Sequence, residues 1–201
     1  MNNPLLTKST LPYGAPQFDK IENQHYMPAF REAIEEGKSE IDAIVNNPEA
    51  ATFTNTIEAL EYAGNTLNHI SRIFYNLLEA DTNEDMQNIA EELAPLTTEF
   101  SMYISLNEGL FKRIKSVYEQ RNNLSLNQEE LRLLEKTYES FARNGANLSP
   151  EDKETYSKYI EELSLLSLQF SKNVLAATNG CSAWNRCGTC RASPCGGGGC
   201  P

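Results

Sequence analysis

The sequence predicts an all-α protein: an antiparallel helical bundle, or stacked helical hairpins, of about six helices with an extended N-terminal arm and a disordered C-terminal tail. Three observations lead to this prediction. Apolar residues recur at steps of three and four, capping signals precede the periodic segments, and no segment alternates as a strand does. We expect an arm over residues 1–24, a helical domain over 25–179 and a Cys/Gly-rich tail over 180–201.

Proline and glycine dominate the arm. Pro12, Gly14 and Pro16 exclude a continuous helix there, because proline lacks an amide donor and restricts the residue before it. The segment that leads from the arm into the first helix is nevertheless rich in large apolar side chains, namely Leu11, Tyr13, Phe18, Ile21, Tyr26 and Phe30. We therefore predict that the arm is ordered and packs along the helices.

The first two helices follow from periodicity. One is predicted from about His25 to Asn46, with its apolar side formed by Phe30, Ile34, Gly37, Ile41 and Ile44. A second is predicted from Ile57 to Leu77, with Thr54–Asn55 as its cap and Gly64 as a small packing residue inside it.

The third predicted helix contains a proline, and an asparagine and a glycine separate it from the fourth. Thr82 and Asp85 have the spacing of a capping box ahead of the third, and Pro95 within it predicts a kink or a break. Asn107 and Gly109 then separate it from a shorter fourth helix that begins near Leu110.

The last two helices have the clearest start signals. Asn127 with Glu130 begins the fifth, which Gly145 ends, and Ser149 followed by Pro150 begins the sixth. The apolar side of the sixth helix is Tyr156, Tyr159, Ile160, Leu163, Leu166, Phe170 and Val174. Short polar turns predict antiparallel neighbours that bury these stripes against one another.

Charge and composition exclude several classes of function. The net charge of −11 disfavours binding to nucleic acid or to an anionic membrane surface, so we expect no such partner. The sequence contains no apolar run of membrane-spanning length and no signal peptide at its start, and all cysteines lie at or after Cys181. We therefore expect a cytoplasmic location.

The arm also carries a family resemblance. The residues that carry it in the arm are Asn3-Pro4-Leu5-Leu6, Ser9-Thr10-Leu11-Pro12-Tyr13, Ala15-Pro16, Phe18-Asp19, His25-Tyr26 and Pro28-Ala29-Phe30. Those beyond the arm are Asn46-Asn47-Pro48, Thr52-Phe53, Asn55-Thr56-Ile57, Ala59-Leu60-Glu61, Leu106-Asn107 and Leu110-Phe111. With these residues the chain resembles the start of bacterial peptidyl-dipeptidases of the thimet oligopeptidase and oligopeptidase A family of zinc metallopeptidases. The resemblance fades near Thr178-Asn179 and covers well under half of a family member.

The residues that the chemistry of such a peptidase requires are absent. A zinc site of this kind needs two histidines one helical turn apart with a glutamate between them as general base. The only histidines, His25 and His69, lie far apart in sequence and form no such motif, and we interpret both as structural. The sequence contains no nucleophile elbow, phosphate loop or dinucleotide fingerprint. We predict no catalytic, cofactor-binding or metal-ligating residue in this chain.

The resemblance implies that these helices form one wall of a narrow channel for short peptides, facing a zinc-bearing half that removes dipeptides from peptide C-termini. We expect the chain to be an incomplete, inactive portion of such an enzyme, with the catalytic half as its natural docking partner and zinc as the cofactor of the whole. Two alternatives remain: a stand-alone helical interaction module, or a protein that binds metal through its cysteine tail.

The tail differs abruptly from the rest. Residues 180–201 contain all five cysteines and no acidic residue. A metal knuckle of Cys187, Cys190, Cys195 and Cys200, a disulfide-linked appendage and out-of-frame translation or a truncated gene product are the three interpretations. We favour the last, because the amphipathic pattern is lost within one or two residues, and we expect the tail to be disordered.

Overall fold

The computed structural model describes residues 3–184, and within this range every regular element is helical, which confirms the predicted fold class. The α-helices are α1 (Tyr26–Val45), α2 (Ala59–Tyr62), α3 (Asn65–Ala80), α4 (Glu84–Ser105), α5 (Glu108–Glu119), α6 (Gln128–Arg143) and α7 (Pro150–Trp184). The shorter turns are η1 (Pro12–Gly14), η2 (Phe18–Lys20), η3 (Asn23–His25), η4 (Phe53–Glu58) and η5 (Arg121–Asn123). Two compact units, Met1–Leu165 and Leu166–Pro201, divide within α7.

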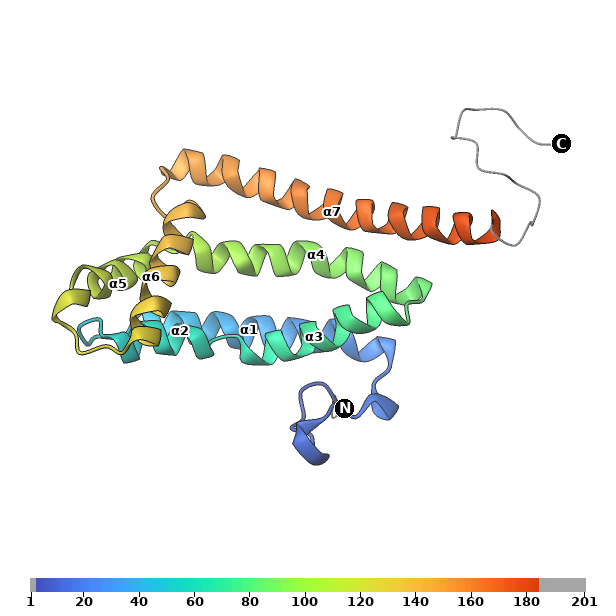
Figure 1. Ribbon diagram of the computed structural model, residues 1–201, viewed down its shortest axis with the longest axis horizontal. Helices are drawn as coiled ribbons and strands as arrows, with labels where there is room; N and C mark the ends of the chain where they lie inside the picture. Colours follow the sequence, from blue (N-terminus) through green and yellow to red (C-terminus); the bar gives the residue numbers. More distant parts are fainter. Residues whose placement is uncertain (1–2, 185–201) are drawn as a thin grey trace. The chain divides into compact units, whose positions relative to one another are not determined.

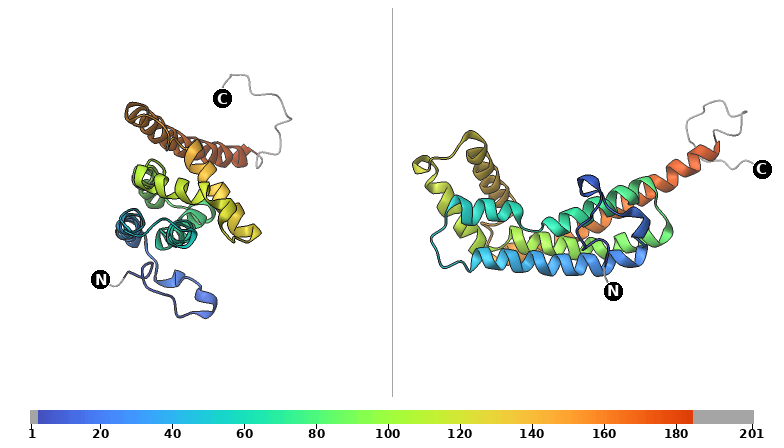
Figure 2. Two further views of the ribbon diagram at one scale, coloured as in Figure 1. Left: turned by 90° about the vertical axis from the view of Figure 1, so that its left-hand side faces the viewer. Right: turned by 90° about the horizontal axis from the view of Figure 1, so that it is seen from below.

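Helix α1 is the centre of the first unit, where it packs against α3, α4 and α5. Figure 1 shows α1, α3 and α4 side by side, with α3 running opposite to the other two, as the short connections predict. The second view of Figure 2 shows the same arrangement from below. Ala29, Phe30, Ala33 and Ile41 of α1 are fully buried, because their spacing places them on the side that faces these neighbours.

The core of this unit has an aromatic end and an aliphatic end. At the first, the ring of Phe74 in α3 lies edge-on to Tyr26 and Phe30 of α1, with centroids 4.8 and 5.7 Å away. At the second, α1, η4, α5 and α6 share one cluster of buried residues: Ile41, Ile44, Ile57, Leu110, Phe111, Ile114, Val117, Leu134, Phe141 and Ala146. The predicted stripes of these helices are therefore buried against one another.

The second predicted helix is interrupted, which corrects the expectation of one continuous helix. Its cap is Thr52, two residues before the expected Thr54, and it runs first as the π-helix η4 and then as the four-residue helix α2. Gly64 then adopts φ +73° and starts α3. Its N–H donates to Oε2 of Glu40 in α1 at 2.7 Å, so a partner distant in sequence holds the break in place.

The other helix starts match the predictions closely. Asn127 and Glu130 form the predicted capping box, with distances of 2.9 and 2.8 Å, and Gly145 at φ +89° follows the end of α6. The third helix is capped by Asn83, one residue after the expected Thr82, through a 2.9 Å bond from the Met86 N–H. It continues through Pro95 without a break.

Only part of the arm packs on the helices. Leu5 is buried, and the Asn3 side-chain amide donates to the carbonyl of His25 at 2.8 Å. Leu11, Tyr13 and Phe18 are exposed, so the expected packing of the arm along the helices does not extend to these side chains. Among the described residues other than glycine, Tyr13 is alone in having a positive φ, +59°.

Helix α7 departs most from the prediction. Its cap forms as expected, since the Asp152 N–H donates to Oγ of Ser149 at 3.2 Å. The apolar stripe that we expected to be buried is largely exposed, however, including Tyr159 and Leu163. The helix also runs to Trp184, five residues past the predicted domain boundary. Residues 185–201, with the proposed metal ligands Cys187, Cys190, Cys195 and Cys200, lie outside the described residues.

Candidate functional site

His25 has a structural role at the start of α1. Its Nδ1 accepts a 3.0 Å hydrogen bond from the backbone N–H of Glu22, and the two residues form a reciprocal capping box around η3. The His25 carbonyl accepts the amide of Asn3. One ring nitrogen and the carbonyl are thus engaged in joining the arm to the first helix, as the sequence predicted for this residue.

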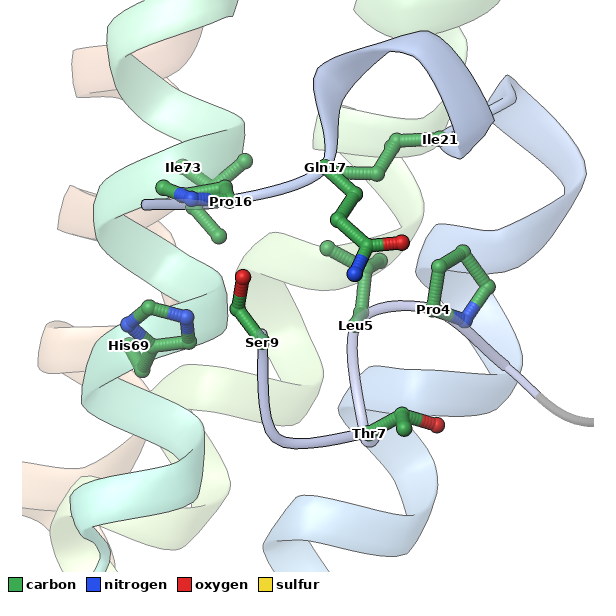
Figure 3. Close-up of a pocket in the computed structure, with 9 residues that line it drawn as sticks. All are labelled: Pro4, Leu5, Thr7, Ser9, Pro16, Gln17, Ile21, His69 and Ile73. Atoms are coloured by element: carbon green, nitrogen blue, oxygen red, sulfur yellow. The ribbon is translucent and has the colours of Figure 1, made fainter. Parts of the chain in front are cut away.

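His69 lies at a small pocket between the arm and α3. Figure 3 shows the lining residues, which are Pro4, Leu5, Thr7, Ser9, Pro16, Gln17, Ile21, His69 and Ile73. The enclosed volume is about 40 Å³, which is room for water molecules and far below the volume of a pocket for a peptide or cofactor. Ser9 is engaged locally, since its Oγ donates to the carbonyl of Ala15. The pocket is therefore a packing gap beneath the arm.

A zinc ion does not fit the donor groups of this part of the chain. Nδ1 of His25 is already an acceptor for a backbone N–H, and His69 is an exposed side chain on α3. Among residues 3–184, no three His, Cys, Asp or Glu side chains lie close enough together to hold a metal ion. We therefore derive no metal-dependent step for the described residues, and the predicted lack of catalytic and ligand residues in the whole chain stays a prediction.

A broader depression lies where α1 meets η4 and α2. Its volume is about 360 Å³, and its lining comprises Glu40, Ala43, Ile44, Asn47, Asn55, Ala59, Tyr62 and Ala63. Several of the motif residues that carried the family resemblance fall here, in the segment from Asn46 to Glu61. This segment contains the π-helix η4, an uncommon element.

Arg113 of α5 orders the loop that borders this depression. Its Nη1 donates to the carbonyls of Asn47 and Glu49 at 3.0 and 3.1 Å, and its Nη2 donates to Oδ1 of Asn55 at 3.1 Å. The Nε atom of Arg113 is buried without a hydrogen-bond partner. Asn55 also exchanges bonds with Thr52 in the cap of η4. The arginine fork thus anchors this irregular backbone from a neighbouring helix.

The sequence pattern alone does not mark Arg113 or Glu40. Both lie on amphipathic helices among other charged residues, where a solvated side chain is the ordinary expectation. Their partners are 24 to 66 positions away, so no local pattern marks them. The motif residues Asn47 and Asn55 were identified through the resemblance, but their shared contact with Arg113 appears only in three dimensions.

Tyr103 of α4 has a hydrogen bond to α1 that shifts its pKa. Its hydroxyl donates to Oδ1 of Asp42 in α1. This hydrogen bond first, then burial and the charge of Asp42, raises the pKa of Tyr103 from 10.0 to about 12. The neutral phenol donates to this carboxylate and so joins two helices.

Comparison with known proteins gives the class to which this architecture belongs. No family model matches the chain. The dipeptidyl carboxypeptidase of Salmonella typhimurium is 41% identical over 176 residues, which is 88% of this chain and 26% of that relative. The Escherichia coli dipeptidyl carboxypeptidase is 39% identical over 87% of the chain, and Escherichia coli oligopeptidase A is 27% identical over 90%. Each comparison spans about a quarter of the relative's length.

These similarities identify the helical body as a segment that bacterial oligopeptidases share. More particularly, the chain corresponds to the N-terminal part of the dipeptidyl carboxypeptidase and oligopeptidase A family, as the arm and loop motifs predicted. None of the helices described over residues 3–184 is long and apolar enough to cross a membrane.

Proposed function

We propose that this chain supplies the helical, non-catalytic portion of a peptidyl-dipeptidase that releases dipeptides from the C-termini of short peptides. The observation that carries the proposal is the 41% identity with a dipeptidyl carboxypeptidase over 88% of the chain. In this proposal the first unit contributes one wall of the substrate channel, and the residues of hydrolysis, with their zinc ion, belong to the rest of the enzyme. The location remains the cytoplasm, as expected from sequence.

The geometry of the first unit supports a role in shape and not in chemistry. Hydrogen bonds connect its segments to one another through three side chains: His25, Arg113 and Tyr103. Such contacts make helices rigid, which is what a channel wall requires to exclude folded proteins and admit extended peptides.

A chimaera tests the proposal. The region of this chain that aligns with the Salmonella typhimurium dipeptidyl carboxypeptidase would replace the corresponding part of that enzyme, and release of dipeptides from a short peptide would be measured with zinc present. We expect the chimaera to release C-terminal dipeptides and the 201-residue chain alone to release none. A folded chimaera without activity, or chelator-sensitive cleavage by the chain alone, would overturn the proposal.

A stand-alone interaction module is the second candidate, favoured by the exposed apolar side chains of the arm and α7. It predicts a monodisperse protein that melts cooperatively and binds a partner unrelated to peptidases with fixed stoichiometry. Sedimentation and calorimetry of the chain distinguish it from the peptidase portion, which we expect to be marginally stable when alone.

A further inference from the structure

The depression between α1 and the segment formed by η4 and α2 has the size of a small binding site. Its volume of about 360 Å³ lies within the usual range for ligand pockets, whereas the gap beside His69 has room only for water. Figure 1 shows α2 beside α1. Every lining residue lies between positions 40 and 63, so the whole depression belongs to the first unit.

Much of the lining is apolar. Ala43 and Ile44 contribute from α1, and Ala59 and Ala63 contribute from α2 and the residue that follows it. Tyr62 also lines the depression, and its side chain is 64% exposed. An aliphatic chain can lie on these methyl groups beside an accessible aromatic ring, and such a surface alone would not select one apolar ligand over another.

Glu40 is the one charged residue of the lining. Its Oε2 accepts the N–H of Gly64 at 2.7 Å, which fixes the position of the carboxylate. Within the part of the chain that the structure describes, its Oε1 accepts no hydrogen bond. A cation placed here would gain an ion pair with Glu40 and a cation–π contact with Tyr62.

The surrounding charge favours the same kind of ligand. From Tyr26 to Tyr62 the sequence contains eight acidic and two basic side chains. One of the two basic residues, Lys38, is already paired with Glu35 at 3.2 Å. The potential around the depression is therefore negative and attracts cations from solution.

The other end of the depression suits a neutral amide. Asn47 and Asn55 line it there, and the guanidinium of Arg113 is bonded to the Asn47 carbonyl and to Oδ1 of Asn55. The positive charge of Arg113 disfavours a second cation at this end. The Asn47 side chain accepts from the Glu49 N–H through Oδ1, which leaves its Nδ2 as a donor for a carbonyl group.

We propose that this depression binds a lysine side chain of a polypeptide. The ammonium group pairs with Glu40, the aliphatic stem lies on Ala43 and Ala59, and the adjoining peptide group meets Asn47. Glu40 and Asn47 are seven residues apart, which is about 10 Å along a helix and matches an extended lysine with its peptide group. The inference goes beyond the proposed function, because it concerns recognition by this chain's own residues and needs no hydrolysis.

A titration of the 201-residue chain tests the inference. The probe is acetyl-Gly-Lys-Gly-amide, and the control is the same peptide with norleucine, which keeps the stem and lacks the ammonium group. The NMR shift of the Gly64 N–H, which is bonded to Glu40, reports on the site. We expect saturation with a Kd on the order of 1 mM for the lysine peptide and binding about fivefold weaker for norleucine.

Two glutamates give matched variants. Glu40→Gln removes the charge and keeps an oxygen for the Gly64 N–H, whereas Glu61→Gln removes one charge from α2 at a position that does not line the depression. We expect Glu40→Gln to weaken binding of the lysine peptide about fivefold and Glu61→Gln to weaken it less than about twofold. Equal losses would mean a general attraction to negative charge and would overturn the site.

Two further variants test the remaining contacts. Tyr62→Leu removes the aromatic ring at an exposed position, so the chain should still fold even if Glu40→Gln does not, and we expect binding about threefold weaker. Ala43→Leu fills the depression without changing its charge and should weaken both peptides. Unchanged affinity in a folded Ala43→Leu or Tyr62→Leu variant would contradict the proposed position of the ligand.

A diamine distinguishes a lysine residue from a free amine. Cadaverine has the same ammonium group and a similar stem, but its second ammonium group would lie near Arg113, so we expect weaker binding than for the lysine peptide. Cadaverine binding as tightly as the peptide, or no saturable shift at Gly64, would overturn the inference. Dipeptide release by the chimaera does not enter these outcomes, so the inference and the proposed function can fail independently.

Discussion

Helices α3 and α7 have the same kind of apolar stripe and opposite surroundings. In α3, Ile70 and Phe74 are fully buried against α1, whereas in α7 Leu163 and Phe170 lie mostly in solvent. Both stripes repeat at three to four residues, so periodicity identifies the apolar side of a helix and not whether another element covers it. The difference teaches that apolar stripes with the same periodicity can be buried by neighbouring helices or left in solvent.

Alanine substitutions of two phenylalanines should show the largest difference in the free energy of unfolding. Phe74→Ala removes a ring that contacts Tyr26 and Phe30 and is expected to cost about 3–5 kcal/mol of unfolding free energy, the usual range for a buried phenylalanine. Phe170→Ala should change it by less than about 0.5 kcal/mol, because the ring is 69% exposed. Urea denaturation followed by circular dichroism measures both, and similar losses would contradict the contrast.

Alanine substitutions of two glycines should show a smaller difference in the free energy of unfolding. Gly64 and Gly14 both have positive φ, +73° and +67°, so an alanine is strained at either position. Gly64→Ala should cost about 1–2 kcal/mol, because the break before α3 is held by the bond to Glu40 and cannot relax. The arm around Gly14 is exposed, and a methyl group added at Gly14 would meet no other atom within 4 Å. Gly14→Ala should therefore relax locally with little effect on global unfolding, and thermal denaturation of the two variants measures the contrast.

The caps of α6 and α7 should differ modestly in how much each contributes to the free energy of unfolding. Asn127→Ala removes the side-chain acceptor of a capping box on a helix whose Leu134 is fully buried, and about 1 kcal/mol is expected. Ser149→Ala removes the cap of α7 and should cost less, about 0.5 kcal/mol, because much of α7 lies outside the core. Thermal denaturation of both variants measures the two losses of unfolding free energy. Their ratio shows which of the two helices is coupled more strongly to global unfolding.

Helix existence and most helix starts could be predicted from the sequence, because the signals are local. The capping box at Asn127, the stop at Gly145 and the start at Ser149 each depend on residues within four positions. The arm motifs likewise predicted the family that the comparisons support.

The remaining features depend on partners distant in sequence. The break at Gly64 is fixed by Glu40, and the loop before η4 is fixed by Arg113, 58 to 66 positions away. The exposure of the stripe on α7 is also a property of what packs against the helix and not of its own pattern. Local periodicity contains none of this information, which is why these three expectations were wrong or missing.

The hydroxyl of Tyr103 gives a small effect that depends on pH. Tyr103→Phe removes one hydrogen bond between α4 and α1 and should cost about 0.5–1 kcal/mol near neutral pH. Because Asp42 raises the pKa of Tyr103 from 10.0 to about 12, the folded state holds this proton more tightly than the unfolded state. The contribution is therefore complete below pH 10 and is lost as the pH rises toward 12.

The pH dependence isolates this bond from general alkaline unfolding. Urea denaturation at pH 8, 9, 10 and 11 should show that the difference between the parent and Tyr103→Phe is constant up to about pH 10 and then shrinks. Tyr13→Phe in the exposed arm is the matched control and should follow the parent at every pH. A difference that grows above pH 10 would mean that the Tyr103 phenolate is better accommodated in the folded state, which the neighbouring Asp42 carboxylate opposes.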